Sequence, residues 1–143
     1  MGRVSDILAG KGREVLSIDA SATVFDAVTQ MVEGNVGSLL VMDGGKLAGI
    51  VTERDYLRRV TILDRDEKTT PVREIMSAPL VYTTPESSIE DCMAIMTDRR
   101  IRHLPVLVEP DEVVGVVSIG DLVKFQSSEQ SVQIKFLEEY ISS

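Results

Sequence analysis

The stretch Gly-Ile-Val-Thr-Glu-Arg-Asp at residues 49–55 has a counterpart in Gly-Val-Val-Ser-Ile-Gly-Asp at residues 115–121. Both segments begin with a glycine, continue with apolar residues and place a hydroxyl three residues before an aspartate. Such a duplication is typical of repeat architectures, in which one unit cannot bury its apolar face alone. We therefore expect two similar units packed together with two related sites between them, rather than a single catalytic centre.

The residues that precede each segment also repeat. Each copy begins with a short amphipathic lead-in, at residues 4–8 and 72–76, and continues with an extended stretch, at residues 15–18 and 80–83. Each unit is then expected to have the order lead-in, strand, helix, strand, strand, helix.

Helix starts and strand pairs follow at matching positions. Thr23 and Ser88 each stand three residues before an acidic residue, a variant of the capping box that begins a helix. Apolar residues then recur at helical spacing, which gives each helix one buried face and places Cys92 in that face. Apolar runs separated by turn residues predict strand pairs at 39–42 with 47–51 and at 104–108 with 113–117.

These patterns predict an α/β (α+β) fold built from a tandem pair of β-α-β-β-α units. The expected parts are a first unit at 1–60, a polar linker at 61–71, a second unit at 72–126 and a C-terminal amphipathic helix at 127–143. In that last helix, apolar residues recur at helical intervals: Val132, Phe136, Leu137, Tyr140 and Ile141. We expect it to pack on the pair or on a partner subunit.

Composition excludes several classes of function. With 143 residues, 43% hydrophobic and 27% charged, the chain is typical of a globular protein with an aliphatic core. Its net charge of -8 and pI near 4.6 disfavour nucleic acid as a partner. We see no apolar run that spans a bilayer and no signal peptide, so we expect no membrane association. The expected location is the bacterial cytoplasm, or an organelle matrix after removal of a presequence.

The chain has one cysteine, Cys92, and one histidine, His103. A lone cysteine forms no internal disulfide, and the pair supplies too few soft ligands for a structural zinc site. We therefore expect no metal and no catalytic cofactor.

Each strand-to-helix junction combines groups that suit a nucleotide. A hydroxyl (Thr52 or Ser118) precedes the free N–H groups of a starting helix, and these groups favour a phosphate. The following aspartate, Asp55 or Asp121, accepts hydrogen bonds and so suits the two hydroxyls of a ribose. The same residues also form an ordinary helix cap, and that alternative stays open at this point.

The wider pattern resembles the CBS-domain family, in particular the tandem pair called a Bateman module. The resemblance covers residues 4–125 and is greatest for the small stand-alone pairs of bacteria and plant organelles. It rests on both glycine-to-aspartate segments, on the lead-ins ending in Ile7-Leu8 and Ile75-Met76, and on the stretches Val81-Tyr82-Thr83-Thr84-Pro85 and Arg102-His103-Leu104-Pro105-Val106.

The resemblance implies two units packed sheet against sheet about a pseudo-twofold axis, with adenosine-containing ligands in two clefts between them. Such ligands include AMP, ADP, ATP, NAD and S-adenosylmethionine. It implies that Ser118 and Asp121 anchor one ligand and that Thr52 and Asp55 anchor the other. It further implies cleft-lining roles for Val36, Gly37, Ser38, Ile101, Arg102 and His103, and adenine contacts for Leu16, Ser17, Ser77 and Val81.

We expect the two sites to differ. Arg102 and His103 are assigned to the Ser118/Asp121 site, where Gly120 would permit close backbone approach and phosphate would bind more strongly. The Thr52/Asp55 site relies on Arg54 for charge. His103 is expected to titrate near neutrality and to make phosphate binding depend on pH. Alternatively, Arg54, Arg99 and Arg100 are solvated surface charges.

Three functions remain. The first is a regulatory module that binds an adenine nucleotide and modulates a partner protein, with the chain itself forming a homodimer through its helices. The second is an enzyme, which the core position of Cys92 and the isolation of His103 disfavour. The third is a structural dimerisation module whose clefts hold no ligand, because fold alone does not determine function.

Overall fold

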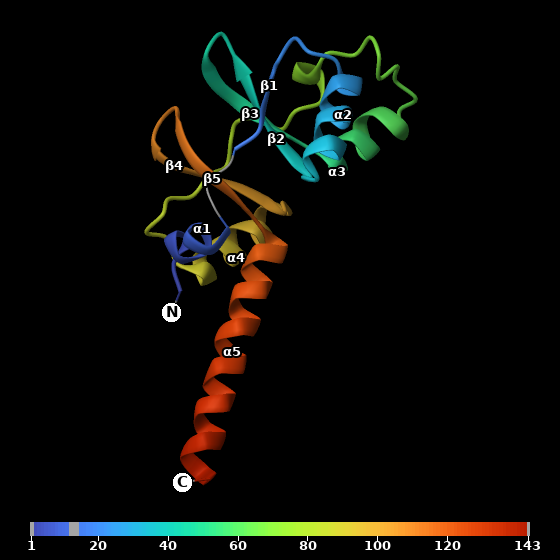
Figure 1. Ribbon diagram of the computed structural model, residues 1–143. Coiled ribbons are helices and arrows are strands. Elements are labelled where there is room, and N and C mark those ends of the chain that lie inside the picture. Colours follow the sequence, from blue (N-terminus) through green and yellow to red (C-terminus); the bar gives the residue numbers. More distant parts are fainter. Residues whose placement is uncertain (1, 12–14, 143) are drawn as a thin grey trace.

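The computed structural model describes residues 2–11 and 15–142, and it describes their side chains except at 131–133, 136 and 140–142. Two small sheets and their flanking helices form two halves (Figure 1). The first half of the chain contains α1 (Val4–Lys11), β1 (Ser17–Asp19), α2 (Val24–Gly34), β2 (Ser38–Asp43), β3 (Lys46–Thr52), α3 (Glu53–Tyr56) and the π-helical turn η1 (Leu57–Thr61). The second half contains the 3₁₀ turn η2 (Val72–Glu74), α4 (Ile89–Arg99), β4 (His103–Glu109), β5 (Glu112–Ser118) and α5 (Ile119–Ser142). The mixed α+β class is confirmed.

Helices α2 and α4 begin where the capping pattern placed them. The Thr23 hydroxyl accepts a hydrogen bond from the Asp26 N–H at 3.1 Å, and the Ser88 hydroxyl accepts one from the Asp91 N–H at 3.0 Å. Each bond satisfies one of the N–H groups that a helix start leaves unpaired. Cys92 lies fully buried on the inner face of α4, as the helical spacing predicted.

The strand pairs are also confirmed, but the two sheets differ in size. In the first, β1 runs parallel to β2, which pairs antiparallel with β3 through a turn where Gly44 and Gly45 have φ of 59° and 80°. Glycine tolerates these positive angles, which the tightest hairpin turns require. In the second, β4 pairs antiparallel with β5, and the expected extended stretch at 80–83 is reduced to one parallel bridge between Thr83 and Val106.

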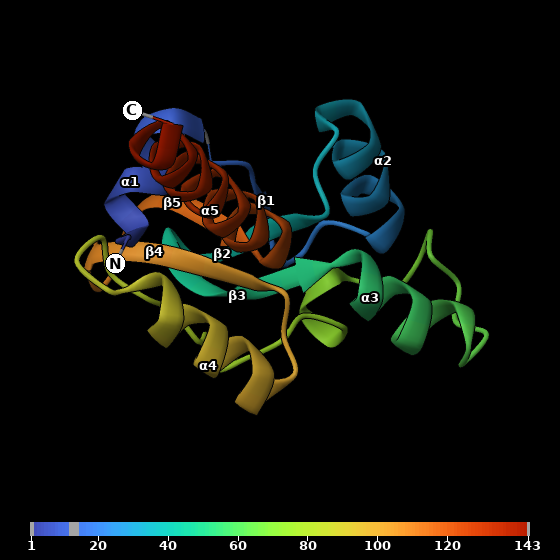
Figure 2. The same cartoon turned by 90° about the horizontal axis from the view of Figure 1, so that it is seen from below.

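The two lead-ins are exchanged between the halves, which the sequence reading did not foresee. In Figures 1 and 2, α1 lies beside α5 in the second half, although it precedes the first sheet in the chain. Its residues Val4, Ile7 and Leu8 complete the core formed by α4, β4, β5 and α5. Val72 and Ile75, in the second lead-in, complete the core formed by β1, α2, β2 and β3. Each buried aliphatic side chain contributes about 2 kcal/mol, so neither half has a full core without the other.

The glycines that open the two duplicated segments make room for the exchanged lead-ins. A Cβ on Gly49 would lie 2.6 Å from the Ser77 carbonyl oxygen and 3.1 Å from the Met76 sulfur. A Cβ on Gly115 would lie 2.6 Å from Cδ2 of Leu8. Both glycines are therefore packing residues of the contact between strand and lead-in.

We expect Gly49→Ala to lower the free energy of unfolding by about 2 kcal/mol, because backbone must move to relieve the contact with Ser77. Gly115→Ala should cost less, under about 1 kcal/mol, because the end of the Leu8 side chain can shift. Urea unfolding of the two variants and the unmodified chain measures both values. Equal costs, or a larger cost for Gly115→Ala, would contradict this account of the motif.

Residues 61–71, expected as a linker, pack closely on the first half. The Val24 and Phe25 N–H groups at the start of α2 donate to the carbonyls of Thr70 and Glu67, each at 2.9 Å. The Tyr56 hydroxyl donates to the Glu67 carboxylate at 2.7 Å. The segment therefore closes over the start of α2 before the chain enters the second half.

The C-terminal helix is the continuation of the second half's last helix. α5 runs without a break from Ile119 to Ser142, and its distal part extends away from both sheets (Figure 1). Ile134 and Leu137 are each 57% exposed, so they do not pack on the pair. The side chains of Val132, Phe136, Tyr140 and Ile141 lie outside the described side chains. No helix in the described ranges is both long and apolar enough to cross a bilayer.

Candidate functional site

The junction at Thr52 forms a complete helix cap that also faces a pocket. The Thr52 hydroxyl accepts from the Asp55 N–H at 3.2 Å, and the Thr52 N–H donates to Asp55 Oδ2 at 3.0 Å. Asp55 Oδ1 accepts a bond from the Ser77 hydroxyl at 3.2 Å, and the residue is only 9% exposed. The capping alternative is therefore correct as local structure. The Asp55 carboxylate can still accept a further hydrogen bond from a ligand, because each oxygen carries two lone pairs.

Asp55 and its cap border a pocket of about 790 Å³ between the two halves of the molecule. This volume lies in the range of small-molecule sites. Besides Thr52 and Asp55, seven predicted site residues line this pocket: Gly37, Arg54, Ser77, Val81, Ile101, Arg102 and His103. Ile50, Pro79, Val81 and Ile101 supply apolar surface.

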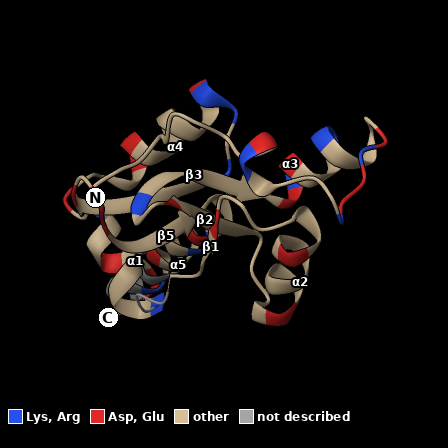
Figure 3. Cartoon of the chain, turned by 90° about the horizontal axis from the view of Figure 1, so that it is seen from above, with Lys and Arg blue, Asp and Glu red and all other residues tan. Residues whose placement is uncertain are grey.

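Six arginines line the same pocket, although the whole chain is acidic. They come from the segment at α3 and η1 and from the end of α4 with the residues after it, which Figure 3 colours blue: Arg54, Arg58, Arg59, Arg99, Arg100 and Arg102. Arg59 donates to the carbonyls of Ile75 and Met76 at 3.0 and 3.1 Å, so the second lead-in positions it. The local charge therefore suits an anion, in contrast to the net charge.

One of these arginines has an unfavourable backbone conformation. Arg100 follows α4 with φ of 56°, in the left-handed region, and its carbonyl accepts a bond from Arg54 Nη1 at 3.4 Å. The matching residue after α2 is Asn35, with φ of 51°. Asparagine tolerates this conformation, whereas a longer side chain costs about 1–2 kcal/mol there. A strained residue beside a pocket is a feature that functional sites share.

Arg102 and His103 border both junctions. Both line the pocket of Thr52 and Asp55. His103 also pairs with Ser118 across the sheet, and the Arg102 carbonyl accepts from the Ile119 N–H at 2.9 Å, beside the Ser118/Asp121 site where we expected them. They reach the pocket of Asp55 because the two halves face each other, so Arg102, before β4, and His103, at its start, lie opposite the end of β3. A Cβ on Gly37 would lie 3.4 Å from His103 Nε2 and 3.2 Å from Glu53 Oε1, which places these three residues together. The pocket of Thr52 and Asp55 is thus built from both repeats.

The pKa of His103 is lowered in the folded chain, so the imidazole titrates below the range of an ordinary histidine. Burial lowers the pKa of His103 below its usual 6.5, and the positive charges of Lys11 and Arg102 lower it further, against the opposing effects of Glu53 and Asp121. The imidazole is therefore neutral at pH 7, and the arginines supply the positive charge of the pocket.

We expect acidification below about pH 7 to destabilise the protein through His103. In this range the unfolded chain, with an ordinary histidine pKa, binds a proton that the folded chain does not, so stability falls as pH falls until the folded pKa is reached. His103→Gln should remove this loss, and no other histidine is present to mask the effect. Urea unfolding at pH 7.5, 6.5 and 5.5 tests it. Identical pH slopes for the two proteins would contradict the lowered pKa.

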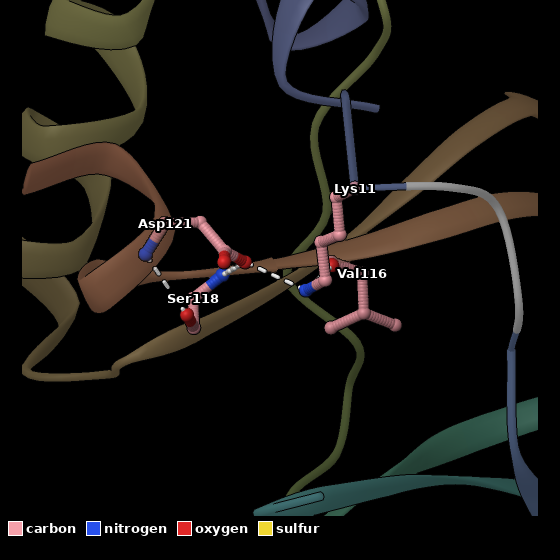
Figure 4. A network of polar contacts seen from close by, with 4 residues as sticks. All are labelled: Lys11, Val116, Ser118 and Asp121. Carbon is pink, nitrogen blue, oxygen red and sulfur yellow. Dashed lines mark hydrogen bonds and ion pairs between the residues drawn. The ribbon is translucent and has the colours of Figure 1, made fainter. Parts of the chain in front are cut away.

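The Ser118/Asp121 junction has the same cap but a different occupant (Figure 4). The Ser118 hydroxyl accepts from the Asp121 N–H at 3.1 Å, and the Ser118 N–H donates to Asp121 Oδ2 at 2.9 Å. Lys11 Nζ donates to that same Oδ2 at 2.6 Å and to the Val116 carbonyl at 2.8 Å. A Cβ on Gly120 would meet only Ser118 Oγ at 3.6 Å, so protein packing does not require glycine there.

Apart from Gly37, which lines both pockets, the remaining predicted residues lie outside the larger pocket. Val36 and Gly37 line a smaller pocket of about 480 Å³ between α2 and α3, whose other walls include the exposed side chains of Val32 and Leu57. Ser38 pairs with Thr52 across the sheet. Leu16 packs on the first core, and Ser17 is exposed on β1. The homodimer expected through the helices stays a prediction.

Sequence reasoning missed Lys11, Glu53, Arg58, Arg59 and Pro79 as residues of these junctions. The pair Arg58-Arg59 follows Asp55 by one helical turn, and this spacing is the signal that could have revealed it. Lys11 and Pro79 carried no such signal, because their positions depend on the exchange of the lead-ins. Among the described residues, no three His, Cys, Asp or Glu side chains group in a way that could hold a metal ion.

Comparisons with a family model, with curated proteins and with solved structures all find proteins with CBS domains. The CBS domain profile matches residues 4–62 and 72–128. The CBS domain-containing protein CBSX3, mitochondrial, of Arabidopsis thaliana is 40% identical across 96% of this chain and 71% of its own length. The CBS domain-containing protein YhcV of Bacillus subtilis is 38% identical across 82% of this chain and 83% of its own. A solved structure of a protein with CBS domains from Burkholderia ambifaria superposes with a TM-score of 0.84 at 45% identity, covering 90% of this chain and 96% of that one.

Proposed function

This chain belongs to the CBS-domain family, and we propose that it is a regulatory module that binds an adenosine-containing nucleotide in the pocket of Thr52 and Asp55. Occupancy of that pocket would then modulate a partner protein. The observation that carries the proposal is the position of a ribose-type acceptor, Asp55, beside six arginines in one pocket between the halves.

The polar groups around Asp55 support the ribose end of such a ligand. The Ser77 hydroxyl donates a hydrogen bond to the Asp55 carboxylate. A sugar hydroxyl can take the place of this donor, or donate to the same carboxylate beside it, without breaking an ion pair. Thr52 holds the carboxylate in place through two bonds to Oδ2, at 3.0 Å from its N–H and 3.1 Å from its hydroxyl. The acceptor is therefore already oriented before a ligand arrives.

The two ends of the pocket suit the two ends of a nucleotide. Ile50, Pro79, Val81 and Ile101 offer an apolar surface for a planar base. The arginines offer forked donors that match phosphate oxygens. A molecule with a base, a ribose and phosphates would use all three kinds of group, and we infer AMP, ADP, ATP or NAD as the ligand class.

We assign the chain no catalytic role. Burial raises the pKa of the Cys92 thiol, so the thiol stays protonated at neutral pH and does not suit nucleophilic attack. Its hydroxyl neighbour, Thr83, is itself buried at 4% exposure. Cys92 is a core residue, and the relatives named above are CBS-domain proteins.

Binding is tested by titration calorimetry with AMP, ADP, ATP and NAD. We expect Asp55→Asn to raise Kd about 10- to 100-fold, because a neutral amide forms weaker bonds to ribose hydroxyls than a carboxylate does. Asn keeps the shape of the side chain, and its amide oxygen can still accept from the Thr52 N–H in the capping box, so the fold should persist. Asp121→Asn is the matched control and should change Kd less than about 3-fold.

Failure of every nucleotide to bind, after bound ligand has been removed from the purified protein, would favour the structural dimerisation module. A loss of affinity in Asp121→Asn but not in Asp55→Asn would place the ligand at the other junction.

The strained arginine gives a separate prediction. We expect Arg100→Asn to stabilise the ligand-free protein by about 1 kcal/mol, because asparagine tolerates φ of 56° as Asn35 does after α2. The same variant should weaken ATP more than AMP, because it removes a phosphate-binding charge. Urea unfolding and calorimetry give the two values. If stability falls, or if affinity for both ligands is unchanged, the strain has no functional meaning.

A further inference from the structure

Lys11 bonds to the Asp121 carboxylate. At the other junction, the Asp55 carboxylate instead accepts from Ser77 and faces the pocket. It is the last residue of α1, the exchanged lead-in, and its side chain reaches across to β5 (Figure 4). Its Nζ lies 2.6 Å from Asp121 Oδ2 and 2.8 Å from the Val116 carbonyl oxygen. One ammonium group therefore uses a carboxylate oxygen and a strand carbonyl at the same junction.

The two repeats differ in this respect. Val4 and Val72 are corresponding lead-in residues, and the same offset matches Lys11 with Pro79. Pro79 has no charge and lines the larger pocket, while the Asp55 carboxylate accepts from a neutral hydroxyl. Ile50, the counterpart of Val116, bonds instead to the Ser77 backbone in both directions, at 2.8 and 3.2 Å. Arginines line the pocket of the first junction, but among the described residues only the second junction's aspartate forms an ion pair with a side chain of the chain itself.

An ammonium in this position competes directly with a ribose. A sugar hydroxyl that reached Asp121 Oδ2 would have to displace Lys11 or share an oxygen that the Ser118 N–H already uses. Because Lys11 is part of the chain, its effective concentration at Asp121 exceeds that of a free ligand. Burial raises the pKa of Asp121, but the Lys11 and Ser118 hydrogen bonds lower it by more, so the carboxylate stays ionised and keeps its cation.

We propose that Lys11 is a tethered occupant of the Ser118/Asp121 junction, which limits the chain to one nucleotide, held at Asp55. This inference rests on the proposed function, and it makes Lys11 a specificity-determining residue for the second site. Removal of the ammonium should free Asp121 for the ribose of a second nucleotide.

The test is the number of ATP molecules bound per chain, measured by calorimetry and confirmed by equilibrium dialysis. We expect one for the unmodified chain and two for Lys11→Met, which keeps the length of the side chain and removes its charge. The second molecule should be lost again in the double variant Lys11→Met/Asp121→Asn. Lys124→Met removes the same charge from an exposed position on α5 and should leave the count at one. Lys11→Gln replaces Lys11→Met if the latter does not fold.

Two outcomes support the inference. A change from one to two supports both it and the proposed function. A change from none to one, lost with Asp121→Asn, supports the role of Lys11 but overturns binding at Asp55.

Three outcomes overturn the inference. Two molecules on the unmodified chain, or a single molecule that is lost with Asp121→Asn rather than Asp55→Asn, would show that Lys11 does not exclude ligand. A count of one in both the unmodified and the Lys11→Met proteins leaves the proposed function intact but shows that Lys11 is not what closes the second junction. No binding to either protein overturns both.

Discussion

The exchange of lead-ins between the two halves is the constraint on which the rest of the structure depends. Val4, Ile7 and Leu8 are buried in the half that the chain builds last, and Val72 and Ile75 are buried in the half that it builds first. Their combined burial is worth several kcal/mol, which is comparable to the whole stability of a small domain. The halves are therefore not independent domains, and the pocket between them has a definite geometry.

The same exchange makes the two junctions chemically unequal. The end of each lead-in and the residues after it reach the aspartate of the core that this lead-in completes, so the junctions differ wherever the lead-ins differ. Ser77 and Pro79 reach Asp55, and Lys11 reaches Asp121. A neutral hydroxyl leaves the charge of its carboxylate available to a ligand, whereas an ammonium at 2.6 Å neutralises that charge and occupies one carboxylate oxygen. Duplicated sequence has thus produced two related but different sites.

The net charge of the chain and the local charge of its pocket have opposite signs. A net charge of -8 argues against broad contact with a polyanion, and that argument concerns the whole surface. Six arginines nevertheless meet at one pocket, because α3 with η1 and the end of α4 converge there. A small anion responds to this local field and not to the sum over the chain. We treated Arg99 and Arg100 as possible surface charges, since spacing along the chain cannot show that two segments meet.

The repeat, the helix starts at Thr23 and Ser88, the strand pairs and the mixed α+β class followed from the sequence by itself, because capping residues and apolar periodicity act over a few neighbouring residues. The local cap at each aspartate followed for the same reason. Only the tertiary structure decided that the lead-ins are exchanged, that Arg102 and His103 also line the pocket of Asp55, and that Lys11 pairs with Asp121. These depend on which of two similar surfaces each segment packs against. A repeated sequence offers both surfaces with nearly the same pattern, so only the packing of the complete chain distinguishes them.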